Sequence, residues 1–326
     1  MADINVGLLG FGQWPRQAYA PVLTELQGVT VRALAARSEA TRQLAIETFG
    51  DQLQCHDQYA SILNDPQIDA VMMALPNNMH AEVIAATIAA EKHLFYEPPV
   101  ALDEASIERV LSAMSQTDRV VQADLELRCL PVIGEVRQLL ADGQIGKTLM
   151  AKISLWCNWG YGGGEWYDEV QGQDFFLWLG CWYLDALDCV FDAAPINANV
   201  VGGCASNGTL MDHGWTTLAY PDDRIGQYEF NLVATTDAKI ALHVVGTDGE
   251  IEADIKSGDY RWRKKGSQWQ QMSAPASGPA AGFEGMRESI CDFFDAIADH
   301  RAPKADVEVS RRVHQAAIAC MRAANQ

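Results

Sequence analysis

Two glycines stand directly after the first apolar run of the chain, in the order Gly10-Phe11-Gly12-Gln13-Trp14. Glycine permits a tight turn and lets the backbone approach a phosphate closely, so this spacing after a strand suits the pyrophosphate of a dinucleotide. Pro15 stands where a third glycine is usual, and proline is accepted in the first turn of a helix. The sequence therefore predicts that residues 10–14 bind a dinucleotide cofactor.

The residues after the second apolar run bear on which dinucleotide is bound. An NAD site usually places Asp or Glu there to bind the ribose 2′-hydroxyl. Here the run ends in Ala35-Ala36 and is followed by Arg37-Ser38. A guanidinium pairs well with a 2′-phosphate. We therefore expect NADP(H), bound in part by Arg37 and Ser38, with NAD(H) as the alternative. It stays open whether Arg37 is only a solvated loop charge.

Strands and helices must position these residues. The sequence shows two regions that differ in their pattern of apolar runs and helical segments. Up to about residue 124, short apolar runs alternate with helical segments, which indicates a parallel sheet with helices on both faces. Beyond that point, strands with turn signals fill residues 194–272, and helical segments cover 132–142, 283–300 and 307–324. We expect an α/β chain of two domains: a Rossmann-type parallel sheet at 1–124, and an α+β domain with a large, mainly antiparallel sheet at 125–326. The expected strands of the first domain are 4–9, 30–35, 70–75, 93–96 and 120–123, and its expected helices are 16–26, one from 39, 80–90 and 103–115.

Composition excludes several classes of partner. The formal charge of −19 repels nucleic acid and anionic membranes, so neither is expected. No run of 18 apolar residues is present. The eight cysteines form no CxxC pair, which favours reduced thiols in a cytoplasmic protein. His80, His213 and His243 lack metal-ligand spacing, so no metal site is predicted. A small-molecule ligand remains the expected partner.

Several short motifs together resemble the Gfo/Idh/MocA family of nicotinamide-dependent oxidoreductases. They are Leu75-Pro76-Asn77-Asn78-Met79-His80, the strand ending in Glu97-Pro98-Pro99, Gly180 to Asp185, and Gly246-Thr247-Asp248-Gly249. The resemblance implies cofactor contacts from Leu75, Pro76, Asn77, His80, Glu97 and Pro98. It also implies a homodimer or homotetramer formed through the C-terminal sheet.

The residues that carry out proton transfer in that family are replaced in this chain. Where the family reads Glu-Lys-Pro, Pro98 stands at the lysine position, and Trp178 and Trp182 stand at the usual aspartate and histidine positions. Neither an indole nor a prolyl ring exchanges a proton near neutral pH. Tyr183 and Glu97 are the remaining candidates for catalysis. For Glu97 the favoured alternative is a structural acid that bonds the backbone near the cofactor.

Aromatic residues are concentrated between 156 and 183. This pattern favours a pocket that stacks a planar or sugar-like ligand, and a helix core with a packed loop is the alternative. The candidate substrate-binding residues are Glu126, Arg128, Trp166, Trp178 and Trp182.

The expected function is an NAD(P)-dependent reductase with a non-standard active site. It should oxidise common sugars and polyols poorly, because the usual base is missing. Two alternatives remain. One is a non-catalytic dinucleotide-binding sensor. The other resembles biliverdin reductases, which also lack the lysine.

Overall fold

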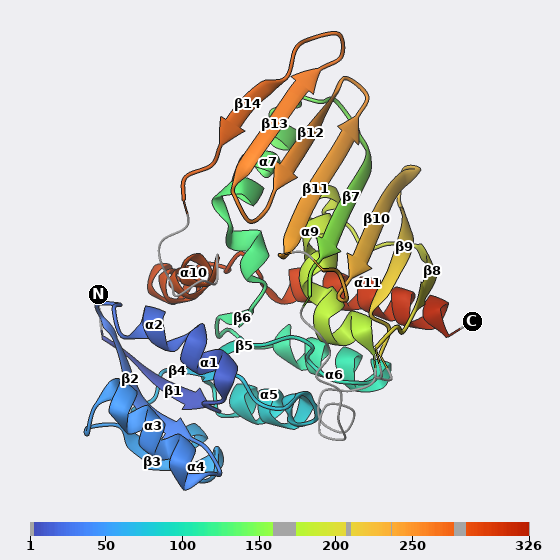
Figure 1. Cartoon of the computed structure of the whole chain (residues 1–326). Coiled ribbons are helices and arrows are strands. Elements are labelled where there is room, and N and C mark those ends of the chain that lie inside the picture. The colour runs from blue at the N-terminus through green and yellow to red at the C-terminus, as the bar shows by residue number, and fades with distance from the viewer. Residues whose placement is uncertain (1–2, 159–173, 207–209, 236, 277–284, 326) are drawn as a thin grey trace. The chain divides into compact units, whose positions relative to one another are not determined.

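The structure, a computed structural model, describes residues 3–158, 174–206, 210–235, 237–276 and 285–325 (Figure 1). Its contacts divide the chain into two compact units. Unit 1 comprises Met1–Asp124 and Gly278–Ser310, and unit 2 comprises Leu125–Ser277 and Arg311–Gln326. The expected second domain, 125–326, therefore needs correction, because residues 278–310 belong with unit 1.

Unit 1 is built on a six-stranded sheet in which every neighbouring pair of strands is parallel. This confirms the predicted Rossmann-type sheet. Its strands are β1 (Ile4–Leu9), β2 (Val29–Ala35), β3 (Gln54–His56), β4 (Ala70–Met73), β5 (His93–Tyr96) and β6 (Val121–Ala123). The strand order is β3-β2-β1-β4-β5-β6. Its helices are α1 (Gln13–Gln17), α2 (Ala20–Leu23), α3 (Glu39–Phe49), α4 (Ala60–Leu63), α5 (His80–Ala89), α6 (Glu104–Met114) and α10 (Met286–Asp299).

The helix expected over 16–26 is wrong in its bounds. Two short helices, α1 and α2, replace it, and Pro21 lies in the first turn of α2. Proline has no N–H and its ring would clash with the carbonyl four residues earlier in a continuous helix. The break therefore follows from Pro21, and it leaves Tyr19 between the two helices.

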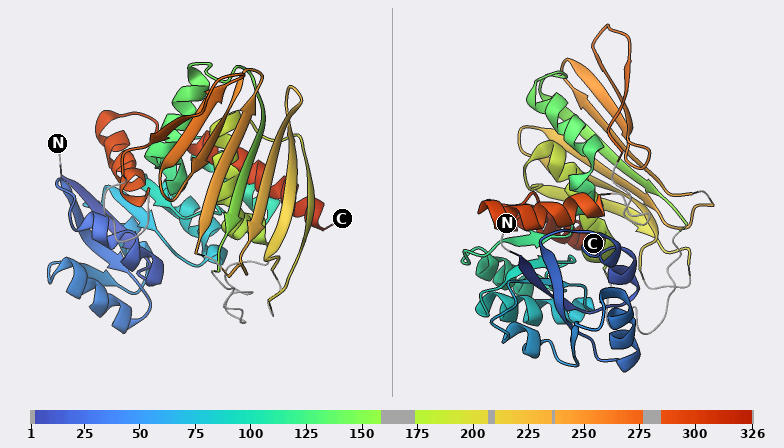
Figure 2. Two further views of the ribbon diagram at one scale, coloured as in Figure 1. Left: turned by 45° about the horizontal axis from the view of Figure 1, so that its top comes forward. Right: turned by 90° about the vertical axis from the view of Figure 1, so that its left-hand side faces the viewer.

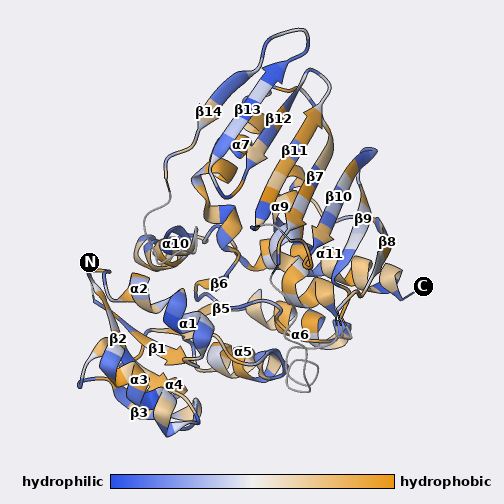
Figure 3. Ribbon diagram, in the orientation of Figure 1, coloured by the Kyte–Doolittle hydropathy of each residue, from blue (hydrophilic) through white to orange (hydrophobic). Residues whose placement is uncertain are grey.

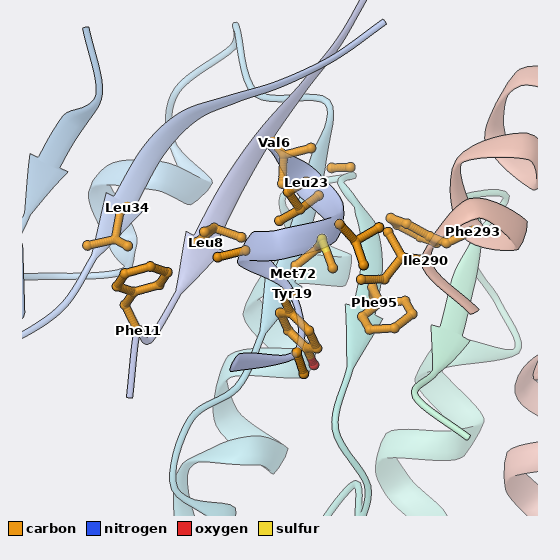
Figure 4. Close-up of a cluster of buried hydrophobic side chains, with 14 of the residues drawn as sticks. Val6, Leu8, Phe11, Tyr19, Leu23, Leu34, Met72, Phe95, Ile290 and Phe293 are labelled. Carbon is orange, nitrogen blue, oxygen red and sulfur yellow. The ribbon is translucent and has the colours of Figure 1, made fainter. Parts of the chain in front are cut away.

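Helix α10 belongs to unit 1 because its apolar face completes that unit's core (Figure 4). Ile290 and Phe293 are fully buried there. The ring of Phe293 lies 5.5 Å from that of Phe95, which in turn lies 5.6 Å from the ring of Tyr19. Burial of several large side chains contributes about 1.5–3 kcal/mol each. A helix distant in sequence is thus bound to the parallel sheet.

Unit 2 is built on an eight-stranded sheet. Only β7 and β10 run parallel, and the other pairs are antiparallel. This confirms the predicted large, mainly antiparallel sheet. The strands are β7 (Thr148–Trp156), β8 (Asn197–Gly203), β9 (His213–Tyr220), β10 (Arg224–Asn231), β11 (Lys239–Gly246), β12 (Gly249–Asp254), β13 (Asp259–Lys264) and β14 (Gln270–Ser273), and the helices include α7 (Pro131–Ala141), α9 (Cys181–Phe191) and α11 (Val307–Ala324), which joins this unit from Arg311 on.

Helices α7 and α9 lie on one face of this sheet, as the edge-on view of Figure 2 shows. The central strands β7 and β11 are largely apolar, whereas the edge strand β14 and its neighbour β13 are polar (Figure 3). Polar edge strands discourage unwanted pairing with other chains. The opposite face carries five exposed large apolar side chains, from 40% to 66% exposed, on adjacent strands: Met150, Trp156, Val201, Trp215 and Ile225.

Among the helices that the structure describes, none is both long and apolar enough to cross a lipid bilayer.

Candidate active site

The two glycines of the turn in unit 1 differ in their surroundings. Gly10 has a φ of +89°, and a Cβ there would lie 2.3 Å from the carbonyl oxygen of Ala74. A Cβ on Gly12, in contrast, would meet no atom within 4 Å, and Gly12 and Gln13 are exposed. The turn therefore needs Gly10 for its shape and leaves open space at Gly12. Such a space fits a dinucleotide that approaches the backbone.

The loop after β2 presents Arg37 to solvent. Ser38 caps α3, its Oγ accepting from the backbone N–H of Thr41 at 3.4 Å. Arg42, which the sequence analysis missed, donates from Nη1 to the carbonyl oxygens of Ala36 and Arg37, at 2.7 and 2.9 Å. The backbone of the loop is thus held by Arg42, while the side chain of Arg37 stays exposed. This arrangement suits a contact between Arg37 and a 2′-phosphate.

Replacing Arg37 with alanine should weaken NADPH binding by roughly ten- to a hundredfold and leave NADH binding unchanged. A charge-assisted hydrogen bond to phosphate contributes about 1.5–3 kcal/mol, and only NADPH carries the phosphate. Calorimetric titration of both cofactors checks this. The exposed Arg109→Ala on α6 is the control and should bind both cofactors as the wild type does. Equal binding of both cofactors by the wild type contradicts the prediction.

His80 is the first residue of α5 and is fully buried. Its Nδ1 and Nε2 lie 2.6 and 2.8 Å from the carbonyl oxygens of Pro99 and Leu75. Burial lowers the pKa of His80. The imidazole therefore ties the segment after β4 to the segment after β5. The neighbouring Asn77 is also buried, and Leu75 and Pro76 are half-buried.

Glu97 stands at the carboxyl end of β5, next to Pro98, and is buried. Its Oε1 accepts a hydrogen bond from the indole Nε1 of Trp14 at 2.5 Å and another from the hydroxyl of Tyr19. Its side chain is also hydrogen-bonded to Asp124. Through Trp14, the acid is joined directly to the glycine turn. The structure thus brings two of the predicted cofactor-binding segments together at Glu97.

Burial shifts the ionisation of Glu97 strongly. Loss of water raises the pKa of its carboxyl group from about 4.5 to about 7, and the hydrogen bonds from Tyr19, Asp124 and Trp14 only partly oppose this. An acid with a pKa near the working pH is what general acid catalysis requires. Unit 1 therefore holds an acid with suitable chemistry one residue before the position of the missing lysine.

The raised pKa of Glu97 predicts a characteristic pH dependence of stability. The unfolded chain loses this proton near pH 4.5 and the folded chain near pH 7, so the folded state holds more protons between those values. The free energy of unfolding should therefore fall as pH rises through this window. One pKa unit corresponds to about 1.4 kcal/mol, so the contribution of Glu97 is about 3 kcal/mol.

Denaturant unfolding from pH 4.5 to pH 7.5 measures this slope. Glu97→Gln cannot titrate, so its curve should be flatter in this window. Asp51→Asn, at an exposed position in a turn, should keep the wild-type slope. Identical slopes in Glu97→Gln and the wild type would show that Glu97 ionises normally.

In unit 2, Trp182 and Glu126 form a second polar contact. The indole Nε1 of Trp182 donates to Oε2 of Glu126 at 2.5 Å, and both side chains are half-buried. Trp178 is also half-buried and lies in a π-helical turn, Phe176–Gly180, directly before α9.

Tyr183 lies in the core of unit 2. It is 3% exposed, and its ring stacks on that of Tyr228 at 5.4 Å. Phe175 belongs to the same cluster and stacks on Phe230 at 4.1 Å. Burial raises the pKa of the Tyr183 hydroxyl well above its ordinary value of 10. These contacts favour a packing role for Tyr183 over proton donation.

Arg128 is buried within a cluster of ion pairs. Its Nη2 lies 2.5 Å from Oδ1 of Asp185 and 2.7 Å from Oδ2 of Asp188. Asp188 also pairs with Arg312, whose Nε lies 2.6 Å from Oδ1. Carboxylates already bind the guanidinium of Arg128. The structure therefore indicates that Arg128 positions α9 relative to the segment at 126–129 rather than offering an open anion site.

The predicted aromatic cluster does not stay together among the described residues. Phe175 and Tyr183 join the core, whereas Trp156 lies on the opposite face of the sheet, where its Nε1 donates to Oε1 of Glu229 at 2.9 Å. Trp178 and Trp182 remain as half-buried indoles. Trp166 lies outside the described residues.

Both halves of the chain match models of one family. Residues 4–125 match a model described as an oxidoreductase family with an NAD-binding Rossmann fold. Residues 133–252 match the GFO/IDH/MocA C-terminal domain. The chain belongs to the Gfo/Idh/MocA family. The family model and the open glycine turn both indicate a nicotinamide dinucleotide as the cofactor.

Individual relatives within the Gfo/Idh/MocA family act on sugars and cyclic polyols, as their names state. Levoglucosan dehydrogenase of Pseudarthrobacter phenanthrenivorans is 29% identical over 168 residues, 49% of this chain and 42% of that protein. Inositol 2-dehydrogenase of Salmonella typhimurium is 25% identical over 148 residues, 45% of this chain and 44% of that protein. The chain thus matches less than half the length of these curated relatives.

Solved structures extend the similarity of fold over the whole chain. Levoglucosan dehydrogenase in complex with NADH and levoglucosan has a TM-score of 0.87 at 18% identity, over 99% of this chain and 97% of that one. An oxidoreductase domain protein from Kribbella flavida has a TM-score of 0.88 at 17% identity, over 100% and 98%. At this identity the likeness concerns the fold.

One group in this Gfo/Idh/MocA chain has metal-ligand spacing that the sequence analysis did not predict. Among the described residues, ligand atoms of His243, Glu250 and Glu252 lie within 4.8 Å of one another on β11 and β12. Each glutamate is already paired with an arginine, Glu250 with Arg263 and Glu252 with Arg261. Because these cations occupy the carboxylates, the group is better described as a surface ion-pair network.

Proposed function

We propose that the chain is an NADP(H)-dependent reductase of a small sugar-like or planar carbonyl compound. The observation that carries this proposal is Glu97, a buried acid with a pKa of about 7, hydrogen-bonded to the glycine turn through Trp14. In open α/β sheets, ligands bind outside the carboxyl ends of the strands, and Glu97 stands at such an end. An acid that keeps its proton near neutral pH favours reduction, which consumes a proton, over oxidation, which requires a base.

The substrate class is inferred from the relatives and from unit 2. Levoglucosan and inositol, in the names of two relatives, are small rings that carry hydroxyl groups. The half-buried indoles of Trp178 and Trp182 are suited to the apolar face of such a ring. Glu126, which Trp182 holds by a hydrogen bond, can accept from a hydroxyl group. These three residues are the proposed substrate-binding set.

Each group has one role in the proposed reaction. A bound reduced nicotinamide supplies the hydride. The chain supplies the open turn at Gly12 for the pyrophosphate, Arg37 for the 2′-phosphate, and Glu97 for the proton. Trp14 and Tyr19 fix one oxygen of Glu97, so the carboxyl group cannot rotate freely. Positioning of this kind lowers the barrier because the acid is already oriented when the charge develops.

The proposal predicts reduction of ketones derived from cyclic polyols. The wild type should oxidise NADPH in the presence of 2-keto-inositol at pH 7, and it should oxidise myo-inositol or levoglucosan with NADP⁺ far more slowly. Absorbance of NADPH measures both directions. Glu97→Gln should lose about 10²–10⁴-fold in the reduction, the usual contribution of a general acid. Asp51→Asn should keep the wild-type rate.

A rival function gives a different result in the same assay. A dinucleotide-binding sensor would bind NADPH in calorimetry and transfer hydride to none of a panel of keto-sugars and keto-inositols. Rapid oxidation of inositol or levoglucosan at neutral pH would contradict the preference for reduction and would show that another group serves as the base.

We further propose that a second copy of the chain covers the open face of the unit 2 sheet. The support is the exposed apolar set Met150, Trp156, Val201, Trp215 and Ile225, which lies on adjacent strands of one face. Met150 lies opposite Ile225 and Val201 opposite Trp215, with the Lys152–Glu229 ion pair between these two groups. Exposed large apolar side chains among polar ones are typical of association surfaces. A homodimer is the simplest assembly that buries this face symmetrically.

A further inference from the structure

A second carboxyl group lies beside Glu97. Asp124 directly follows β6, and Tyr96 pairs with Ala123 in the parallel register of β5 and β6. The backbone N–H of Asp124 donates to the carbonyl oxygen of Tyr96 at 2.8 Å. The ends of two neighbouring parallel strands therefore bring the two acids together, and their side chains are hydrogen-bonded. Asp124 is fully buried, whereas Glu97 is 9% exposed.

A hydrogen bond between two carboxyl groups requires a proton, because two carboxylates have no hydrogen atom to share. Two buried negative charges in contact would also repel each other strongly. Among the residues that the structure describes, the side chains that bond Glu97 are Trp14, Tyr19 and Asp124, and none of these three is a cation. The chemistry of the pair therefore calls for one retained proton.

Hydrogen-bond donors from the surrounding elements fix one oxygen of each acid. Trp14 and Tyr19 donate to Oε1 of Glu97. The hydroxyl of Ser289, on α10, donates to Oδ1 of Asp124 at 3.1 Å. Gln122 donates to Oγ of Ser289 at 3.2 Å, which directs the serine hydrogen toward Asp124.

We propose that Glu97 and Asp124 hold one proton between them and act as a single acid that protonates the substrate during reduction. This role rests on the proposed function. As hydride adds to the carbonyl carbon, the π-electron pair moves to the carbonyl oxygen, and the proton passes from the pair to that oxygen. The pair is left with two negative charges and regains one proton from water. Glu97 is the more exposed member of the pair, and the repulsion between the two charges favours rapid uptake of the new proton.

Carbon-13 NMR of the intact protein tests the sharing without any substrate. Glutamate and aspartate are labelled separately at the side-chain carboxyl carbon, and the signals of Glu97 and Asp124 are assigned from Glu97→Gln and Asp124→Asn. The carboxyl signals of Glu97 and Asp124 should titrate together, and the pair should keep one proton at neutral pH. Each amide variant should abolish this behaviour in the partner, whereas Asp51→Asn should not. Titration of both groups below pH 5, as for ordinary surface acids, overturns the proposal.

NADPH oxidation with 2-keto-inositol as a function of pH tests the catalytic part. In Asp124→Asn the amide can donate to Glu97, which then ionises at lower pH. The fall of kcat with rising pH should therefore move to lower pH by about one unit or more. An unchanged profile in this variant overturns the role of the pair as proton donor, even where NMR shows the shared proton.

The two proposals fail in distinguishable ways. A shared proton in NMR together with no NADPH oxidation on any keto-inositol or keto-sugar means that the proposed function has failed, and the donor role fails with it. If an amide variant does not fold, the carbon-13 titration of the wild type shows whether Glu97 and Asp124 share one proton. Ser289→Ala, which keeps both acids, then replaces Asp124→Asn. Loss of its donor disfavours the charged aspartate, so its profile should move to higher pH.

Discussion

Replacing Arg128 with methionine should lower the free energy of unfolding by about 3–5 kcal/mol, because the buried Asp185 loses its paired cation and Asp188 keeps only Arg312. Arg128 contacts both Asp185 and Asp188, and all three side chains are at most 4% exposed. Burial already raises the pKa of Asp185 to about 6 despite the neighbouring guanidinium. Without Arg128 the buried charges lose their main stabilising partner. Denaturant unfolding at pH 7 measures the effect.

The matched control for Arg128 is an exposed ion pair. Arg287 lies 2.5 Å from Glu25, with side chains 28% and 58% exposed. Solvent screens such a pair, so Arg287→Met should cost less than about 1 kcal/mol. A stable Arg128→Met variant whose only defect is a raised KM for the substrate would show that Arg128 binds the ligand and does not support the fold.

The sheet architecture was predictable from the sequence because local patterns determine it. Continuous apolar runs alternate with helical segments up to residue 124, and the structure places these runs as parallel strands. The position of α10 was not predictable in the same way. Its apolar face is visible in the sequence, but which sheet it packs against depends on contacts between segments far apart in the chain, such as Phe293 with Phe95.

The site was predictable where single segments form it. The glycine turn and the loop at Arg37 are local, and their geometry suits the predicted cofactor. The Glu97–Asp124 contact needed the strand order. A usable signal was nevertheless present: each acid directly follows an apolar run, and neighbouring parallel strands end at the same edge of a sheet. The role of Tyr183 could not be predicted from the sequence, because a tyrosine on an apolar helix has the same local pattern whether it lines a pocket or packs in a core.

Alanine at either glycine of the turn should weaken cofactor binding, but only alanine at Gly10 should also destabilise the fold. In Gly10→Ala the new Cβ would lie only 2.3 Å from the carbonyl oxygen of Ala74. The residue also has a φ of +89°, which alanine rarely adopts. Strain of this kind costs of order 1–3 kcal/mol, and the clash with backbone adds to it. The variant should unfold at lower denaturant concentration and bind NADPH poorly.

Gly12→Ala should fold as stably as the wild type and still lose cofactor affinity. Its Cβ would meet no protein atom within 4 Å, so the substitution should not destabilise the folded state. A pyrophosphate that approaches the backbone there would meet the new methyl group, and we expect NADPH affinity to fall at least about tenfold, or about 1.4 kcal/mol. Denaturant unfolding and calorimetric titration of both variants separate the two effects. Wild-type affinity in a stably folded Gly12→Ala would place the pyrophosphate elsewhere and would remove the glycine turn from the site.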